Sequence, residues 1–282
     1  MLSRLLSIFI LLAIANGSIS QTLDARNFRL YTIDNGLTDN KILGIVQDST
    51  GYIWIATQHG LNRFDGNTFN SFLKTNRYNP IPDNAIFSIR LLGNELAVAT
   101  DNGAQIISTT TLKQKNLNTP TSEALHYWAN ACRYVNTDDA GNYGVSTKTG
   151  FYVFSNEGKL KKRFDYYTEK DIGHAWMMFG SKLHRLPDGN LMQQNSEGLL
   201  VYNRIKNTIG DVGAFYPALK NIHPALNNLQ LFQMVSQRDL LLVNINNNSF
   251  DLIDIQTGDV RRFPACFRLF NEIGWQTNPS LV

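Results

Sequence analysis

Two histidine–tryptophan motifs contain the residues of this chain that are best suited to hold a ligand. They read His126-Tyr127-Trp128 and His174-Ala175-Trp176, and their Trp residues lie 48 positions apart. Aromatic faces beside polar donors suit a carbohydrate, whose C–H faces are apolar and whose hydroxyl groups need hydrogen-bond partners. The alternative interpretation is that both Trp side chains pack in the core, where aromatic residues are common.

Catalytic chemistry is not indicated by any motif. The chain has no GxSxG, HExxH, P-loop or dinucleotide-binding fingerprint, and its five His residues show no i,i+4 pairing, so we predict no catalytic residue, metal or cofactor. A glycan lyase or hydrolase would need two carboxylates that face a cleft. Placement in turns explains the available carboxylates more simply, although this enzymatic alternative stays open; they are Asp48, Asp65, Asp138, Asp139 and Asp188.

The elements that position the motifs belong to a repeat of 43 to 48 residues. Each copy has an apolar strand, a short polar turn that ends in Gly, and a second strand. A further short strand precedes each copy and another follows it, which gives four antiparallel strands per unit. Such units at this period predict an all-β fold, the β-propeller. The turn glycines are Gly60, Gly103, Gly150 and Gly198, and a degenerate fifth copy spans residues 240–254.

We expect about five blades and the start of a sixth, and no long amphipathic helix. Radial packing of blades buries both faces of each sheet and leaves only short edges exposed. Residues 28–33 read as a strand that would complete the last blade of a closed ring, so we expect the chain to be the N-terminal part of a seven-bladed propeller. The blades are expected near residues 36–73, 84–116, 129–165, 177–213 and 228–263, with a partial blade from residue 267.

The histidine–tryptophan motifs fall in the connections between blades. In a propeller these connections share one face with the turns between the second and third strands, and loops are where binding residues concentrate. Trp128 and Trp176 each lie 13 residues before a turn glycine, so we expect them to be neighbours on one rim. The predicted ligand-facing rim contains His126, Tyr127, Trp128, His174 and Trp176, with Gln58 and His59 from the first blade.

Residues 35–72 resemble the two-component regulator propeller repeat. The matching segments are 35–40, 45–48, 51–57 and 60–66, with Thr38 in place of Ser, Ala56 in place of Gly and Phe64 in place of Tyr. We expect Trp54 to pack between blades and Gly60 to allow a close backbone approach or a positive φ. The other motif residues are expected to shape two turns: Asp48, Gly51, Asp65 and Gly66.

The resemblance implies the periplasmic sensor part of a bacterial hybrid two-component or histidine-kinase regulator. Several members of this family sense oligosaccharides and signal as dimers, and their kinase lies beyond the propeller. The resemblance therefore implies an oligosaccharide ligand and a homodimer formed through regions outside this chain, with no enzymatic activity in the chain itself. A protein-interaction scaffold is the alternative.

The N-terminal twenty residues are typical of a signal peptide. Arg4 precedes an apolar run over residues 5–15, and Ser18 and Ser20 place small residues before Gln21, where we predict cleavage. An uncleaved anchor is the alternative. The mature chain is thus expected to be periplasmic or otherwise extracytoplasmic. It has no later run of 18 apolar residues, so membrane attachment would need a segment beyond it.

Charge and cysteine content add two exclusions. Only 17% of residues are charged and the net charge is +3, so we expect no nucleic-acid partner. The basic run at residues 159–163 suits the solvated edge of an outer strand. Cys132 and Cys266 lie 134 residues apart, and although their spacing does not decide pairing, we expect two buried free thiols.

Overall fold

Twenty short strands dominate the computed structural model, which describes residues 28–119, 130–165, 183–195, 198–220, 232–236, 238–244 and 249–264. In these ranges the helical pieces are single turns: η2 (Ile33–Asn35), α3 (Val212–Phe215) and η5 (Pro217–Leu219). The strands are β1 (Ile42–Gln47), β2 (Ile53–Thr57), β3 (Gly60–Phe64), β4 (Phe69–Phe72); β5 (Ile86–Leu92), β6 (Glu95–Thr100), β7 (Gly103–Ser108), β8 (Gln114–Leu117); β9 (Cys132–Thr137), β10 (Tyr143–Thr147), β11 (Gly150–Phe154), β12 (Leu160–Asp165); β13 (His184–Arg185), β14 (Leu191–Asn195), β15 (Gly198–Asn203), β16 (Thr208–Asp211); and β17 (Phe232–Met234), β18 (Asp239–Asn244), β19 (Ser249–Asp254), β20 (Val260–Pro264).

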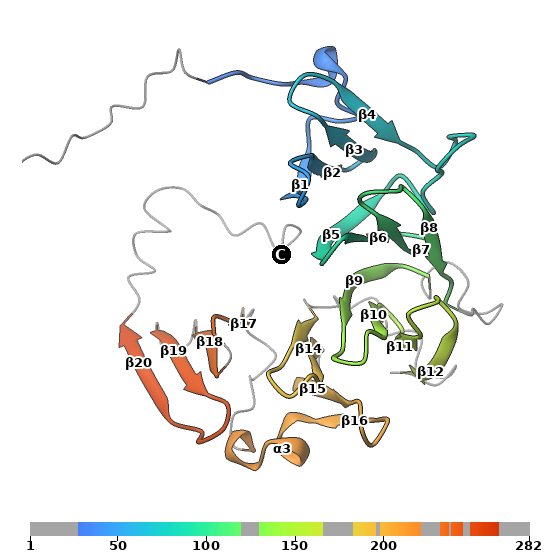
Figure 1. Ribbon diagram of the computed structural model, residues 1–282. Helices are drawn as coiled ribbons and strands as arrows, with labels where there is room; N and C mark the ends of the chain where they lie inside the picture. The colour runs from blue at the N-terminus through green and yellow to red at the C-terminus, as the bar shows by residue number, and fades with distance from the viewer. Residues whose placement is uncertain are drawn as a thin grey trace, which may run out of the picture.

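The strands form five separate four-stranded antiparallel sheets, each built from four strands consecutive in the chain. We number these sheets blades 1 to 5 in chain order. The blades follow one another around an arc, with β1, β5 and β9 on its inside and β4, β8 and β12 on its outside (Figure 1). The all-β propeller fold is therefore confirmed, with five blades in the described part of the chain.

The hydrophobic core consists of apolar layers between consecutive blades. Because side chains alternate along a strand, β6 contributes Leu96 and Val98 to the layer with blade 1 and Ala97 and Ala99 to the layer with blade 3. Separate layers join blade 3 to blade 4 and blade 4 to blade 5. Each sheet thus buries both faces only through its neighbours, as radial packing requires.

Hydrogen bonds between neighbouring blades recur at about one repeat of separation. The Asn136 Nδ2 atom donates to the carbonyl of Leu183 at 2.9 Å across 47 residues, and this bond is buried. The hydroxyl of Ser88 donates to the carbonyl of Arg133 at 2.6 Å across 45 residues. These bonds fix the order of the blades as well as their contact.

The propeller has two faces that differ in their connections. We call one the connection face; it carries the segments that join blades and the turns between second and third strands, such as residues 58–59, 101–102 and 148–149. We call the other the turn face; it carries the turns between first and second strands and between third and fourth strands, such as residues 48–52 and 138–142. All later residues are placed by these two faces.

The N-terminal segment at residues 28–33 is not a strand, so this expectation was wrong for the described structure. Residues 28–32 are irregular and Ile33 opens η2. A strand needs an adjacent sheet edge to accept its backbone hydrogen bonds, and this segment pairs with no described sheet. It is held instead by Tyr31, whose ring lies 5.0 Å from that of Phe64 and 5.5 Å from that of Phe69.

Candidate functional site

The predicted rim is represented on the connection face by Gln58 and His59. Both lie in the turn between β2 and β3, where the backbone N–H of Gln58 donates to the carbonyl of Lys41 at 3.1 Å. The other predicted rim residues lie outside the described residues, so their arrangement stays a prediction: His126, Tyr127, Trp128, His174 and Trp176.

An ion pair holds the imidazole of His59 on this face. Its Nδ1 atom contacts the Asp39 carboxylate, and the His59 side chain remains 66% exposed. The backbone N–H of Lys41 and the bond with His59 lower the pKa of Asp39, against an opposing effect of desolvation. His59 therefore presents an exposed polar ring whose orientation is set by a neighbouring carboxylate.

A buried polar cluster supports this turn from below. The hydroxyls of Thr38 and Thr57 are 2.8 Å apart, and the Asn62 side chain exchanges bonds with both the N–H and the hydroxyl of Thr38. The Thr57 hydroxyl also donates to the carbonyl of Gly60 at 2.9 Å. These bonds use the polar groups of the cluster within the blade and leave His59 as its exposed neighbour.

The turn face holds a polar cleft that the sequence did not predict. It has a volume of about 510 Å³ and lies among blades 2, 3 and 4. Its charged walls come from different blades, because Glu95 and Lys115 belong to blade 2, Asp139 to blade 3 and Arg185 to blade 4. The cleft is on the face opposite to the predicted rim.

One wall of the cleft is a hydrogen-bonded triad. The Lys115 Nζ atom donates to Glu95 Oε1 at 2.7 Å, to the Tyr143 hydroxyl at 2.6 Å and to the Asn156 carbonyl at 2.9 Å. The Tyr143 hydroxyl donates to Glu95 Oε2 at 2.5 Å. Burial lowers the pKa of Lys115, but its bonds to Glu95 and Tyr143 outweigh burial and raise it. Lys115 has no N–H left for a ligand, so the triad joins blade 2 to blade 3.

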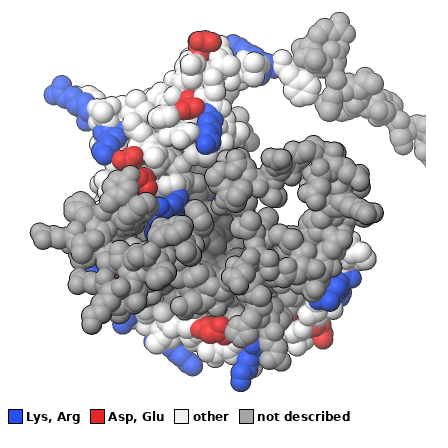
Figure 2. Space-filling model, turned by 180° about the vertical axis from the view of Figure 1, so that it is seen from behind, with Lys and Arg blue, Asp and Glu red and all other residues white. Residues whose placement is uncertain are grey.

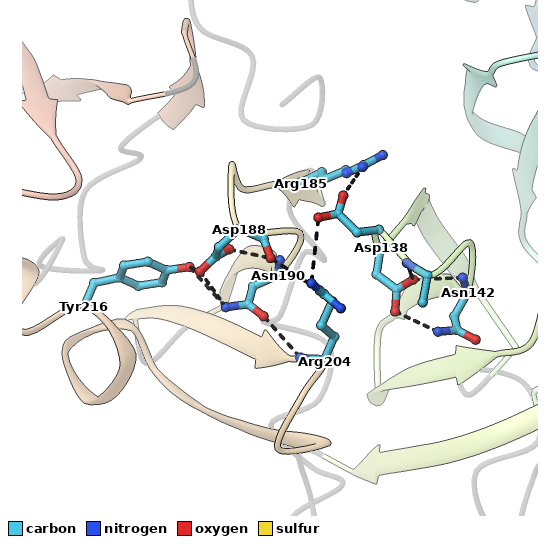
Figure 3. Close-up of polar contacts among 9 residues, drawn as sticks. Asp138, Asn142, Arg185, Asp188, Asn190, Arg204 and Tyr216 are labelled. Carbon is cyan, nitrogen blue, oxygen red and sulfur yellow. Dashed lines mark hydrogen bonds and ion pairs between the residues drawn. The ribbon is translucent and has the colours of Figure 1, made fainter.

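The other wall joins blade 3 to blade 4 (Figure 3). The Arg185 guanidinium donates to the carboxylate of Asp139, and Arg204 forms a longer ion pair with the same carboxylate at 4.0 Å. Gly189 lies so close that a Cβ atom there would be 2.2 Å from Asp139 Oδ2. A side chain at position 189 would displace this carboxylate, which explains the glycine by contact as well as by its φ of +79°.

Most turn carboxylates are accounted for by their own turns, as expected. Asp138 accepts from the backbone N–H groups of Ala140 and Asn142, and Asp188 accepts from that of Asn190. Asp188 also accepts from the hydroxyl of Tyr216 at 2.5 Å (Figure 3). Asp139 is the exception, because its carboxylate leaves the turn and binds the next blade. The sequence carried a signal for this, since Asp139 and Arg185 are separated by 46 residues, about one repeat.

Three further properties of the described residues bear on function. No group of three or more His, Cys, Asp or Glu side chains among them could hold a metal ion. Within the same ranges, no helix is long and apolar enough to cross a membrane. Figure 2 shows Lys and Arg side chains of the described residues at several separate places, with Asp and Glu side chains among them.

Cys132 is a buried free thiol, and Cys266 lies outside the described residues. Burial raises the pKa of the Cys132 thiol to about 12, against smaller opposing effects of the Gly103 backbone and the Arg133 charge. A thiol with so high a pKa is not ionised at neutral pH and is a poor nucleophile.

Comparison with known proteins supports the first-blade resemblance. The sequence profile of the two-component regulator propeller family matches residues 36–59. Histidine kinase P4 of Formosa agariphila is 42% identical over 53 residues, which is 19% of this chain and 4% of that protein. The chain thus matches only a small part of this relative.

Solved structures share the fold at low sequence identity. The extracellular domain of the hybrid two-component system BT4673 from B. thetaiotaomicron has a TM-score of 0.51 and 16% identity over 80% of this chain and 28% of that chain. The WD40 domain of Neurospora crassa Pan2 has a TM-score of 0.51 and 12% identity over 80% of this chain and 66% of that chain. Both likenesses establish the propeller architecture.

Proposed function

We propose, from the two-component regulator propeller repeat that this chain carries, that it is the extracytoplasmic ligand-sensing module of a two-component signalling receptor. The observation that carries the proposal is the family match at residues 36–59, which form part of blade 1. A sensing role in signalling follows from that family. The kinase that would receive the signal would be encoded outside this chain.

The proposed ligand is an oligosaccharide bound on the connection face. Two features support this face over the opposite one. His59 is exposed there, and its ring is oriented by Asp39. On the turn face, by contrast, Lys115 spends its donors on neighbouring blades. The predicted Trp128 and Trp176 would supply the aromatic surfaces that saccharide rings stack on.

The proposed location of the chain is the periplasm, after removal of residues 1–20. The extracellular placement of the BT4673 domain in its own system is in keeping with this. Attachment to the inner membrane and assembly into a homodimer would then depend on segments that follow the propeller in the full receptor.

The test is a thermal-shift and calorimetric screen of the secreted chain against oligosaccharides of defined composition. At least one should raise the melting temperature, as ligands of the native state do. Trp128→Ala with Trp176→Ala should then abolish the shift, whereas Ile205→Ala, a change at a side chain that is 80% exposed on the turn face, should keep it. Binding that persists unchanged in the double variant would remove the rim, and the absence of any ligand would favour a scaffold.

Release of new reducing ends from the bound oligosaccharide would instead identify a hydrolase, and appearance of an unsaturated product would identify a lyase. Either product would contradict the proposal that the chain only senses its ligand. The same incubations, followed by chromatography of the saccharide, make this distinction directly.

A further inference from the structure

Arg133 occupies an unusual place on the inner strand of blade 3. It is the second residue of β9, at the end of the strand that reaches the connection face. Its guanidinium carbon lies 3.6 Å from the centroid of the Phe87 ring, which belongs to β5 of blade 2. The guanidinium is thus stacked on an aromatic face between two blades, an arrangement that fixes the plane of its N–H groups.

The hydrogen-bonding edge of this guanidinium has no protein partner in the described part of the chain. No hydrogen bond or ion pair of the Arg133 side chain is formed there, and its Nε atom is buried without an acceptor. Other arginines in blades 3 to 5 each bind a carboxylate: Arg163, Arg185, Arg238, Arg261 and Arg262. A buried charged donor without an acceptor is costly, so this one calls for an explanation.

The backbone around Arg133 is held in place by neighbouring blades and turns. Its carbonyl accepts from the Ser88 hydroxyl at 2.6 Å. The backbone N–H of Lys148 donates to the carbonyl of Ala131 at 3.3 Å, which brings a second cation close to the start of β9. The side-chain position is therefore prepared by the fold rather than by a ligand.

The charge balance at this place is positive. The pKa of Lys148 is lowered by burial first and then by the charge of Arg133, with Asp101 acting in the opposite direction. Asp101 lies in the equivalent turn of blade 2, and its charge also acts on Arg133. One carboxylate thus faces two cations, and the site retains an excess of positive charge.

We propose that Arg133 and Lys148 form a subsite on the connection face that binds an oxyanion group of the ligand, a carboxylate or a sulfate. The planar edge of a guanidinium matches two oxygens of such a group, and Phe87 presents that edge in a fixed orientation. A purely structural role for Arg133 explains the stack on Phe87 but leaves the N–H edge without an acceptor. The subsite rests on the proposed function for the assignment of the anion to a saccharide.

The experiment measures binding of four probes to the full chain by calorimetry: a neutral oligosaccharide, its uronate-containing analogue, its sulfated analogue and inorganic sulfate. Arg133→Gln should weaken binding of the charged saccharides about tenfold to a hundredfold, the loss typical of hydrogen bonds to a charged group. It should leave the neutral saccharide unchanged. Arg163→Gln, a matched change at an arginine paired with Asp165 on an outer strand, should have no effect on any probe.

A second variant protects the test if Arg133→Gln disturbs the fold. Lys148→Gln leaves the stack on Phe87 in place and should weaken the same charged probes, while binding of the neutral one persists. Preference for the uronate or for the sulfated saccharide identifies the source of the oxyanion.

The outcomes separate this proposal from the general one. Neutral and charged saccharides that bind equally, in the parent chain and in both variants, would overturn the oxyanion subsite and leave saccharide sensing intact. Binding of inorganic sulfate that depends on Arg133, without binding of any saccharide, would support the subsite and overturn the oligosaccharide assignment.

Discussion

At the scale of single residues, Asp48 shows how one carboxylate can organise a blade. Its Oδ1 atom accepts from the backbone N–H groups of Thr50 and Tyr52, and its Oδ2 atom accepts from the indole Nε1 of Trp54 at 2.8 Å. Trp54 is fully buried in the layer between blades 1 and 2. The turn and the core therefore share one acceptor, which joins two roles that the sequence assigned to separate residues.

Asp48→Asn is expected to lower the free energy of unfolding by about 1.5–3 kcal/mol at pH 7, because an amide nitrogen in place of Oδ2 cannot accept the indole N–H. Urea denaturation measures the change. Asp65→Asn is the matched control, since Asp65 caps an exposed turn where water can replace its bonds, and it should cost less than about 1 kcal/mol. Equal losses in the two variants would contradict the special role of the indole bond.

The same pair predicts a pH dependence. Desolvation opposes ionisation of Asp48, but the bonds from Thr50, Trp54 and Tyr52 outweigh it and lower the pKa of this carboxylate. A lowered pKa in the folded state gives stability that is present above the unfolded pKa of about 3.9 and is lost as the pH falls through the folded value. The difference between the parent chain and Asp48→Asn should be constant from neutral pH to about pH 5 and shrink below about pH 4.

At the scale of elements, the turn between β2 and β3 depends on Gly60 for two reasons. Its φ is +143°, and a Cβ atom would come within 2.6 Å of Leu73 Cδ2 and 3.3 Å of the Phe72 carbonyl. A left-handed φ and a close approach of β4 are thus both built into one position. This turn also carries Gln58 and His59, so its geometry sets the described part of the predicted rim.

Gly60→Ala should destabilise the chain more than Gly51→Ala, which isolates the cost of the backbone alone. Gly51 also has a positive φ, of +93°, but a Cβ there would meet nothing within 4 Å. We expect about 1–2 kcal/mol for Gly51→Ala from the unfavourable φ, and about 1–3 kcal/mol more for Gly60→Ala from overpacking. The midpoints of urea denaturation give both values, and a smaller loss at position 60 would show that Leu73 moves aside without cost.

At the scale of the whole molecule, the layers between blades distribute stability along the arc. Blade 1 shows what a missing neighbour does, because Ile42, Leu43 and Ile45 on β1 remain exposed where no described blade covers them. Ile89 and Leu91, on the strand that occupies the same place in blade 2, pack instead against the layer that blades 1 and 2 share. Each interior blade is thus stabilised by two neighbours and blade 1 by one in the described structure.

Ile106→Ala is expected to cost about 2–5 kcal/mol, because Ile106 is fully buried in the layer that blades 2 and 3 share. Native-state hydrogen exchange should show protection falling in both blades, since one layer serves both. Ile205→Ala, at an exposed side chain, should change stability by no more than about 0.5 kcal/mol. Loss of protection confined to blade 2 would contradict the shared layer.

The amino-acid sequence determined the strands, their order within each blade and the turn chemistry. Alternating apolar residues and turn residues such as Asp48 and Gly60 act over a few positions, so their signal is readable without a partner. β6, β7 and β19 begin and end at the residues expected of them. The segment at residues 28–33 failed because a strand also needs a sheet edge, which local pattern does not supply.

Only the tertiary structure decided which side chains meet between blades. The stack of Arg133 on Phe87, the triad of Glu95, Lys115 and Tyr143, and the pair of Asp139 and Arg185 join residues 20 to 48 positions apart. Such contacts depend on how each sheet twists and how closely the next one packs against it. A periodic sequence shows that blades will be neighbours, but it does not show which polar groups their packing leaves paired and which it leaves open.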